Sequence, residues 1–433
     1  EKTKILVVTE AILVRKLQSD QSLENVAMII FDEFHERSIH TDLSLALSLQ
    51  VQELLREDLK LLIMSATLNS EELLKLLGEV PVLTSQGRSY EVENIYLSES
   101  IKQPDYKTMP STVVDTILHS ITNDEGDILV FMSGTKEIKT IQKLLGEKLT
   151  NKSIEVLPLY STLNKKEQDR AIQKSKNRKI ILSTNIAQTS LTIEGVKVVI
   201  DSGLEKQSRY NYSNGMNHLE LSFISSDSAI QRAGRAGRLS HGKCYRLWHE
   251  KKILQASTKA EILRSDLSNF ILDVTLWGVE ELDELKFLDI PSVEVVNSTK
   301  EVLQELHMLD SSFEITNFGK EAIKLGVHAR FAFMILKANE LSCAYEACLL
   351  TSILNNKDIL KDNRNNSDIA LRFFALYKGQ DKSDNTINSY ALKEIIKQTD
   401  TLYKKLKSLK NINKTITFDE ELLSVLLLLA YPD

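Results

Sequence analysis

A pair of adjacent acidic residues follows one of the apolar runs in this sequence. Asp32 and Glu33 come directly after residues 26–31, a run that predicts a buried β-strand. Ligands of parallel α/β sheets bind at the carboxyl ends of the strands, so both carboxylates are expected at a binding crevice. One carboxylate there could hold Mg²⁺ through its water shell, and the other could accept a proton from an attacking water. A solvated acidic turn is the alternative interpretation, because Asp-Glu pairs are common.

Two segments rich in hydroxyl side chains also follow strand candidates. Ser65-Ala66-Thr67 comes after residues 61–64 and could hydrogen-bond the acidic turn, although a plain turn is the commoner reason for such residues. Residues 183–193 follow the run 180–183, and their hydroxyl and amide groups suit contacts with a nucleic-acid backbone. A cluster that caps the next helix explains this second segment equally well.

The most specific pattern is Gln231-Arg232-Ala233-Gly234-Arg235-Ala236-Gly237-Arg238. Gln231, Arg235 and Arg238 stand at i, i+4 and i+7, so a helix would place them on one face. Several aligned guanidinium groups need anionic partners, and the charge of a triphosphate is the natural one. Arginines supplied by a second domain couple domain closure to hydrolysis in phosphoryl-transfer enzymes. A solvated basic helix is the alternative, although it would not need such small spacers.

Apolar β-branched runs alternate with helical patterns through the first 250 residues. The strand candidates are residues 5–8, 26–31, 61–64, 128–132, 154–157, 180–183 and 196–200. Strands buried on both faces, separated by helices such as residues 42–56 behind a possible Asp42 cap, predict a parallel α/β sheet. Prolines and glycines interrupt the pattern between residues 80 and 110, where we expect a boundary between two α/β domains.

The rest of the chain has a mostly helical pattern. Amphipathic helices dominate from residue 259, with one short extended piece at residues 313–316. This pattern predicts a small helix-rich domain with a β-wing, followed by a helical bundle from about Gly326. Residues 422–430 are still strongly apolar, so we expect the intact protein to continue beyond them.

Composition excludes some classes of protein. The 433 residues carry a net charge of −6, which argues against a wholly basic nucleic-acid-coating protein but leaves room for a local cationic channel. No apolar run approaches the length of a membrane span, so no membrane partner is expected. The three cysteines, Cys244, Cys343 and Cys348, are expected to be small buried residues rather than a disulfide framework or a metal site. Cytoplasm is therefore the expected compartment.

In this order and spacing, the segments resemble the motifs of superfamily 2 helicases of the DEAH-box branch. The matching segments are Val8-Thr9-Glu10 (motif Ib), Asp32-Glu33-Phe34-His35 (II), Ser65-Ala66-Thr67 (III), Val130-Phe131-Met132-Ser133-Gly134 (IV), Pro158-Leu159-Tyr160-Ser161, Thr184–Thr192 (V) and Gln231–Arg238 (VI). Within the branch, residues 31–38 and 242–248 are most similar to the bacterial HrpB-type ATP-dependent helicases. This resemblance implies an α/β fold of two RecA-like parallel-sheet domains, the first one incomplete, then a winged-helix domain and a helical bundle. The expected domain limits are 1–95, 96–250, 251–325 and 326–433.

The resemblance also implies roles for single residues. Asp32 would bind Mg²⁺ through water, Glu33 would position or deprotonate the hydrolytic water beside the metal, and His35 would relay between the nucleotide and strand sites. The residues that would contact the triphosphate of ATP are Gln231, Arg235 and Arg238, the last two as arginine fingers. Those that would contact the nucleic-acid backbone are Thr9, Ser161, Thr184 and Asn185. Residues 204–223 resemble the strand-separating β-hairpin of the branch, and Asn214-Gly215 is typical of a hairpin turn.

The sequence departs from the family pattern at two points. Gln188 stands where the family commonly has Glu, which changes the expected hydrogen bonds around it. The chain also contains no Gly-x-x-x-x-Gly-Lys-Ser/Thr sequence, the loop that cradles phosphates. We therefore expect that loop upstream of Glu1, and we expect this chain alone to hydrolyse ATP poorly or not at all.

Three hypotheses about function remain open from the sequence. The leading one is an ATP-dependent helicase or translocase that moves along single-stranded nucleic acid, expected to be RNA, with protein partners unspecified. The second is a nucleic-acid- or partner-binding module without ATPase activity. The third is an ATPase that remodels protein–RNA complexes without unwinding, which would share every motif with the first.

Overall fold

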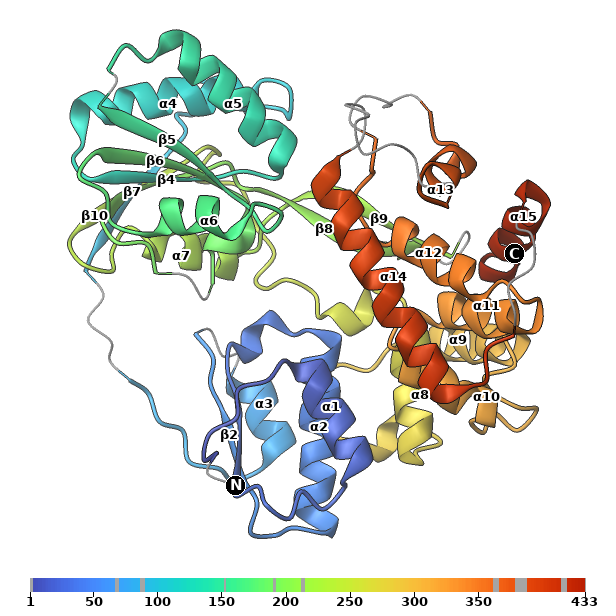
Figure 1. Ribbon diagram of the computed structural model, residues 1–433. Coiled ribbons are helices and arrows are strands. Elements are labelled where there is room, and N and C mark those ends of the chain that lie inside the picture. Colours follow the sequence, from blue (N-terminus) through green and yellow to red (C-terminus); the bar gives the residue numbers. More distant parts are fainter. Residues whose placement is uncertain are drawn as a thin grey trace.

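The computed structural model consists of two α/β parts followed by a helical part (Figure 1). The residues that it describes are 3–66, 70–85, 90–151, 153–189, 192–211, 215–360, 366–377, 388–413 and 419–432. The predicted α/β fold class, with parallel sheets ahead of a helical C-terminal region, is confirmed.

The first α/β part contains a two-stranded parallel sheet. Strand β1 (Met28–Phe31) pairs with β2 (Lys60–Ile63), and the partners run from Met28 opposite Lys60 to Phe31 opposite Ile63. The helices of this part are α1 (Glu10–Ser19), α2 (Ile39–Leu54) and α3 (Ser70–Leu77). Ile29 and Phe31 are buried in the core, whereas Met28 and Ile30, which alternate with them along the strand, are about half exposed. The expectation of a strand buried on both faces is therefore wrong here, because the core packs against one face of the sheet only.

Two further predictions in this part are wrong. Residues 5–8 form no strand: Ile5 and Val7 are 84% and 90% exposed, and no strand in the described ranges pairs with them, although a strand needs a hydrogen-bonded neighbour. Helix α2 begins at Ile39 rather than behind Asp42, because Ser38 is its cap and accepts a hydrogen bond from the backbone N–H of Thr41.

The second α/β part is built on a six-stranded parallel sheet. Its strand order is β3-β10-β7-β4-β6-β5. The strands are β3 (Val92–Tyr96), β4 (Asp127–Phe131), β5 (Ile154–Leu159), β6 (Arg178–Ser183), β7 (Val196–Asp201) and β10 (Gly242–Arg246). Helices α4 (Met109–Asn123) and α5 (Thr135–Lys148) cover one face of the sheet, and α6 (Lys165–Ile172) and α7 (Ser226–Gly234) cover the other (Figure 1). The sequence predicted β4, β5, β6 and β7 but neither β3 nor β10, which are rich in polar residues.

A long antiparallel hairpin leaves this sheet. Strands β8 (Leu204–Asn211) and β9 (Met216–Phe223) pair from Leu204 opposite Phe223 to Asn211 opposite Met216, so the predicted hairpin is confirmed. Asn214 of the expected turn lies outside the described residues, and Gly215 adopts a φ of 63°. Arg264, which follows the hairpin in the chain, donates a hydrogen bond to the carbonyl of Ser208 in β8 at 3.1 Å and so holds the hairpin in place.

The helical part packs directly onto the first α/β part. Its helices are α8 (Ser268–Trp277), α9 (Val293–Glu305), α10 (Asn317–Leu325), α11 (Ala329–Glu340), α12 (Ala344–Leu354), α13 (Ile369–Tyr377), α14 (Ser389–Leu409) and α15 (Glu420–Ala430). One apolar core runs continuously through both parts. Trp277 donates to Gln50 at 2.6 Å and Gln18 donates to Asp273 at 2.9 Å across this junction.

The three cysteines are free and buried, as the sequence predicted. Burial raises the pKa of the Cys244 thiol, in β10, to about 12. None of the helices in the described ranges is long and apolar enough to cross a bilayer.

Gly203, which connects β7 to the hairpin, tests the close packing of the second sheet. It has a φ of 71°, and a Cβ there would lie 2.7 Å from the indole ring of the buried Trp248. We expect Gly203→Ala to lower the thermal unfolding midpoint, because strain and overpacking together cost about 1–3 kcal/mol. The matched control is Gly146→Ala inside α5, where nothing lies within 4 Å, and it should hold or raise the midpoint. Equal midpoints for the two variants would contradict this account.

Candidate nucleotide and nucleic-acid site

The acidic turn after β1 is held in a constrained backbone conformation. Glu33 and Arg37 have φ values of 50° and 48°, unusual for residues with side chains, and they flank a short 3₁₀ turn (Phe34–Glu36). The backbone N–H of Phe34 donates to the carbonyl of Met64 at the end of β2, and the Phe34 ring is buried. The turn therefore presents its carboxylates at the carboxyl ends of two adjacent parallel strands, where the sequence placed them.

Within this turn the two carboxylates, Asp32 and Glu33, are followed closely by a histidine, His35. Asp32 is exposed and accepts a hydrogen bond from the backbone N–H of Glu33 at 2.9 Å. The imidazole of His35 lies 3.6 Å from the Glu33 carboxylate through Nε2, and its Nδ1 is 3.4 Å from the backbone nitrogen of Ala66. His35 thus contacts both the acidic pair and the hydroxyl-rich segment after β2. Thr67 of that segment lies outside the described residues.

Arg37 attaches the acidic turn to the helical part of the chain. Its guanidinium donates to Asp42 at 2.8 Å and to Asp289 at 2.7 Å. Burial raises the pKa of Asp42, and the hydrogen bond from Arg37 opposes that rise. Glu261 adds two contacts, since its carboxylate accepts from the N–H of Ile39 and its own N–H donates to the carbonyl of Arg37. The turn is therefore fixed from a segment more than 200 residues away in sequence.

The arginine-rich segment does not form one continuous helix. Helix α7 ends at Gly234, and the chain continues in turns, so the expectation that Gln231, Arg235 and Arg238 share a helical face is wrong. The turns after the helix pack closely against residue 90. Gly237 approaches residue 90 so closely that a Cβ would lie 2.5 Å from the carbonyl oxygen of Tyr90, and its own carbonyl accepts from the N–H of Tyr90.

Gln188 organises the segments that lie beside α7. Its side-chain amide donates to Ser228 at 3.0 Å and to Gln231 at 3.2 Å, while its side-chain oxygen accepts from Arg232 at 3.0 Å. Its backbone carbonyl accepts from Arg235. A Glu here could accept but could not donate, so the two donated bonds depend on the amide. Sequence reasoning flagged this position as a departure but did not assign it a positioning role.

Arg232 is the buried ion of this region. Its guanidinium is fully buried, lies 3.0 Å from the equally buried carboxylate of Asp201 and 3.7 Å from Glu205 at the base of the hairpin, and stands 4.9 Å from the centre of the Phe131 ring. A buried charge requires such compensation. The sequence could not single out Arg232 among the three arginines of the segment, because its burial depends on strands β4, β7 and β8.

Arg235 and Glu33 act on each other across the two α/β parts. Burial and the neighbouring charge of Arg238 lower the pKa of Arg235 to about 10, and Glu33 opposes that shift. Arg238 reaches in another direction and donates to Thr192 at 2.6 Å. The negative charge of Glu33, in the first α/β part, thus acts on Arg235 in the second.

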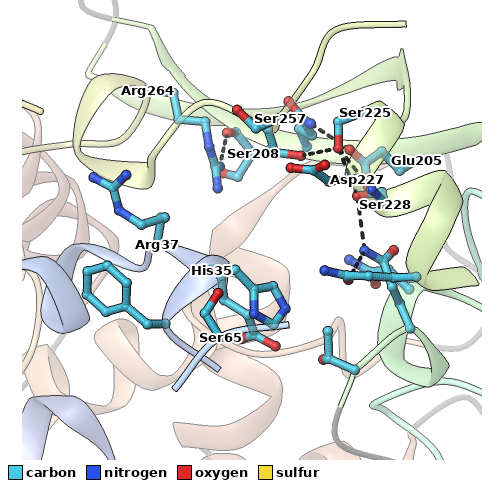
Figure 2. Close-up of a pocket in the computed structure, with 18 of the residues that line it drawn as sticks. His35, Arg37, Ser65, Glu205, Ser208, Ser225, Asp227, Ser228, Ser257 and Arg264 are labelled. Carbon is cyan, nitrogen blue, oxygen red and sulfur yellow. Dashed lines mark hydrogen bonds between the residues drawn. The ribbon is translucent and has the colours of Figure 1, made fainter. Parts of the chain in front are cut away.

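A polar cavity of about 630 Å³ opens where the two α/β parts and the helical part meet (Figure 2). His35, Arg37 and Ser65 line it from the first part, while Glu205, Asp227 and Ser228 line it from the second. Ser257 and Arg264 close it from the segment that follows. The cavity thus collects polar groups from the segments that follow β1, β2 and β6.

Known proteins share both the sequence and the fold of this chain. Residues 111–240 match the family described as the helicase conserved C-terminal domain. The chain is 36% identical over 375 residues to the ATP-dependent RNA helicase HrpB of Escherichia coli, which covers 86% of this chain and 45% of that protein. It is 36% identical over 368 residues to the ATP-dependent RNA helicase HrpA of the same organism, which covers 83% and 28%.

A solved structure extends the match to nearly the whole chain. The crystal structure of the Escherichia coli DEAH/RHA helicase HrpB superposes with a TM-score of 0.83 at 34% identity, covering 99% of this chain and 51% of that one. The chain thus contains a helicase conserved C-terminal domain and is similar in sequence and fold to a DEAH/RHA helicase. It spans less than half the length of the two curated relatives.

Some of the site residues expected from the DEAH-box resemblance line the cavity, and the others do not. His35, Gln231, Ser161 and Asn185 line the cavity. Asp32, Glu33, Arg235 and Arg238 do not line it, although Glu33 interacts with His35 and with Arg235. Thr184 precedes Asn185 at the end of β6, and its N–H donates to the carbonyl of Leu159. Thr9 is exposed at the start of α1 and lies outside the cavity lining.

Removal of the Asp201 charge from its buried ion pair with Arg232 should lower the stability of the protein. Asp201→Asn leaves the fully buried Arg232 with one compensating carboxylate fewer, which we expect to destabilise the protein by about 3–5 kcal/mol. The thermal unfolding midpoint of this chain measures the loss. The matched control is Asp115→Asn, which breaks the exposed pair with Lys148 and should leave the midpoint nearly unchanged. Similar midpoints for both variants would show that the buried pair contributes no more than a surface pair.

Proposed function

We propose that this chain is the coupling region of an ATP-driven helicase that moves along single-stranded RNA. The observation that carries the proposal is the polar cavity between the two α/β parts, which His35 of the acidic turn, Gln231 of the arginine segment and Asn185 of motif V all line. A group expected to contact the triphosphate and a group that suits the RNA backbone thus share one interdomain cavity. Domain closure in such an arrangement couples hydrolysis to strand movement.

The roles of single residues follow from their positions. Glu33 positions or deprotonates the attacking water, and His35 connects it to the segment after β2. Gln231, Arg235 and Arg238 contact the triphosphate, with Gln188 holding the first two in place. Thr9, Ser161, Thr184 and Asn185 contact the sugar–phosphate backbone, which positions a strand without reading its sequence.

Mg²⁺ fits the donor set at the acidic turn. The carboxylates of Asp32 and Glu33 are oxygen ligands, and Asp32 is exposed, which suits an ion that keeps several waters and needs only one or two protein carboxylates. When bound, the ion neutralises charge on the phosphates. The chain's own contribution is to orient the two carboxylates through the constrained turn.

A division into four domains supports this function. The first ends before β3 rather than at residue 95, because β3 pairs with β10 of the second sheet. The second extends to residue 250, a winged-helix domain covers 251–325, and a helical bundle covers 326–433. The antiparallel bridge between Leu309 and Ile315 supports the proposal of a wing in this domain. Three free, buried cysteines support a reducing compartment such as the cytoplasm.

ATP hydrolysis tests the proposal. In the longer protein that carries the phosphate-binding loop, we expect turnover that single-stranded RNA stimulates, whereas this chain alone should show little because it contains no such loop. Glu33→Gln should lower kcat at least about 100-fold while RNA binding persists, because it removes the residue that handles the water. Glu57→Gln, an exposed carboxylate away from the cleft, is the control.

The same experiment separates the competing functions. RNA binding without turnover in the longer protein would overturn the enzyme proposal and favour a binding module. Turnover that RNA stimulates without any unwinding of an RNA duplex would favour remodelling of protein–RNA complexes instead.

A further inference from the structure

The side-chain amide of Gln188 has only one orientation that satisfies its neighbours. Nε of Arg232 lies 3.0 Å from the side-chain oxygen of Gln188, and a guanidinium can donate hydrogen bonds but cannot accept them. Arg232 cannot turn away, because it is fully buried and bound to the buried carboxylate of Asp201 at 3.0 Å. The oxygen of the Gln188 amide must therefore face Arg232, and its NH₂ group must face the other way.

That NH₂ group sets the orientation of a second amide, in Gln231. The nitrogen of the Gln188 amide lies 3.2 Å from the side-chain oxygen of Gln231. A group that faces an amide N–H has to accept, so Gln231 turns its oxygen to Gln188 and its own NH₂ group away. In the described ranges no group accepts from this NH₂ group, and Gln231 is half-buried and lines the polar cavity. The buried Arg232 thus orients Gln231 through Gln188.

The hydroxyl of Ser228 is oriented in the same way. Its oxygen accepts from the amide of Gln188 at 3.0 Å and from the hydroxyl of Ser225 at 3.1 Å. Both lone pairs are then used, so the O–H of Ser228 can only donate. Figure 2 shows Ser225 and Ser228 side by side in the lining of the cavity. Two groups on the α7 side of the cavity, in Gln231 and Ser228, are therefore set as hydrogen-bond donors.

We propose that Gln188 is a positioning residue that presents Gln231 to the cavity as a hydrogen-bond donor to an oxygen of the triphosphate. The backbone carbonyl of Gln188 also accepts from Nε of Arg235 at 2.9 Å, so one residue holds both an amide donor and a guanidinium. Donor groups beside a cation favour a phosphate oxygen, which only accepts. The inference rests on the proposed function and adds which atoms of Gln231 meet the nucleotide.

A Glu at position 188 would reverse the polarity of this contact. Its carboxylate would still accept from Arg232, but it has no N–H to donate to Gln231. The amide of Gln231 would then turn its NH₂ group toward the carboxylate and its oxygen toward the cavity. Since Glu and Gln have side chains of the same length, Gln188→Glu changes the orientation of Gln231 without removing the side chain that holds it.

The first test is the kinetics of ATP hydrolysis in the longer protein that carries the phosphate-binding loop. Gln188→Glu should raise the KM for ATP about 10-fold and leave kcat near the wild-type value, because a hydrogen bond to the charged triphosphate is lost in the ground state and the transition state alike. A merely structural role would lower kcat or the thermal unfolding midpoint instead. Neither should change, because Arg232 keeps its acceptor.

The negative charge of the new Glu is separated from the orientation of Gln231 by a double-mutant cycle. In a Gln231→Met background there is no amide to orient, so Gln188→Glu should change the KM by less than about 3-fold, the effect of the charge alone. A KM change of the same size in both backgrounds would show that Gln188 does not act through Gln231, and it would overturn the proposal.

The second test uses this chain alone, without nucleotide. In a sample labelled with ¹⁵N at glutamine side chains, the NH₂ signal of Gln231 is the one that disappears in Gln231→Met. Its hydrogens should exchange quickly with water in the wild type, because they face the cavity, and more slowly in Gln188→Glu, because the carboxylate binds them. Equal exchange rates would contradict the orientation and overturn the proposal.

The two tests fail separately. A longer protein without any ATP turnover overturns the proposed function and the triphosphate as the acceptor, whereas slower exchange in Gln188→Glu would still establish the orientation of Gln231. Normal ATP turnover with equal exchange rates leaves the proposed function standing and removes the positioning role of Gln188.

Discussion

The buried charge of Arg232 is the constraint around which the second α/β part is arranged. A guanidinium with no exposed surface has to be compensated, and its partners come from three elements: Asp201 at the end of β7, Glu205 at the base of the hairpin and Gln188 after β6. Helix α7, the strand beside it and the hairpin are therefore joined at one point. A shift of any of these elements would expose or unpair a buried charge.

A second set of contacts ties the acidic turn to the helical part. Arg37 holds Asp42 within its own part and Asp289 from the far end of the chain, and the apolar core continues through the same junction. The first α/β part is thus fixed to the helical part more firmly than to the second sheet. Between the first part and the second sheet lies the polar cavity, lined by His35 from one side and by Gln231 from the other.

Local sequence patterns were sufficient for much of the fold and for part of the site. The central strands of the second sheet are continuous apolar runs because both of their faces are buried, so β4 and β6 could be predicted. Edge strand β3 is polar and could not be recognised without its partner β10. The predicted strand at residues 5–8 does not form, because an apolar run becomes a strand only where a neighbouring strand pairs with it.

The sequence by itself determined which residue types stand at strand ends, and so the chemistry available: the carboxylates after β1, the amides and hydroxyls after β6, and the arginines after α7. Only the tertiary structure decided which of these groups meet. The ion pair of Arg232 with Asp201 and the hydrogen bond from Arg37 to Asp289 both join segments far apart in the chain. Such contacts depend on how whole elements pack, because spacing along a helix or strand carries information only about its own faces.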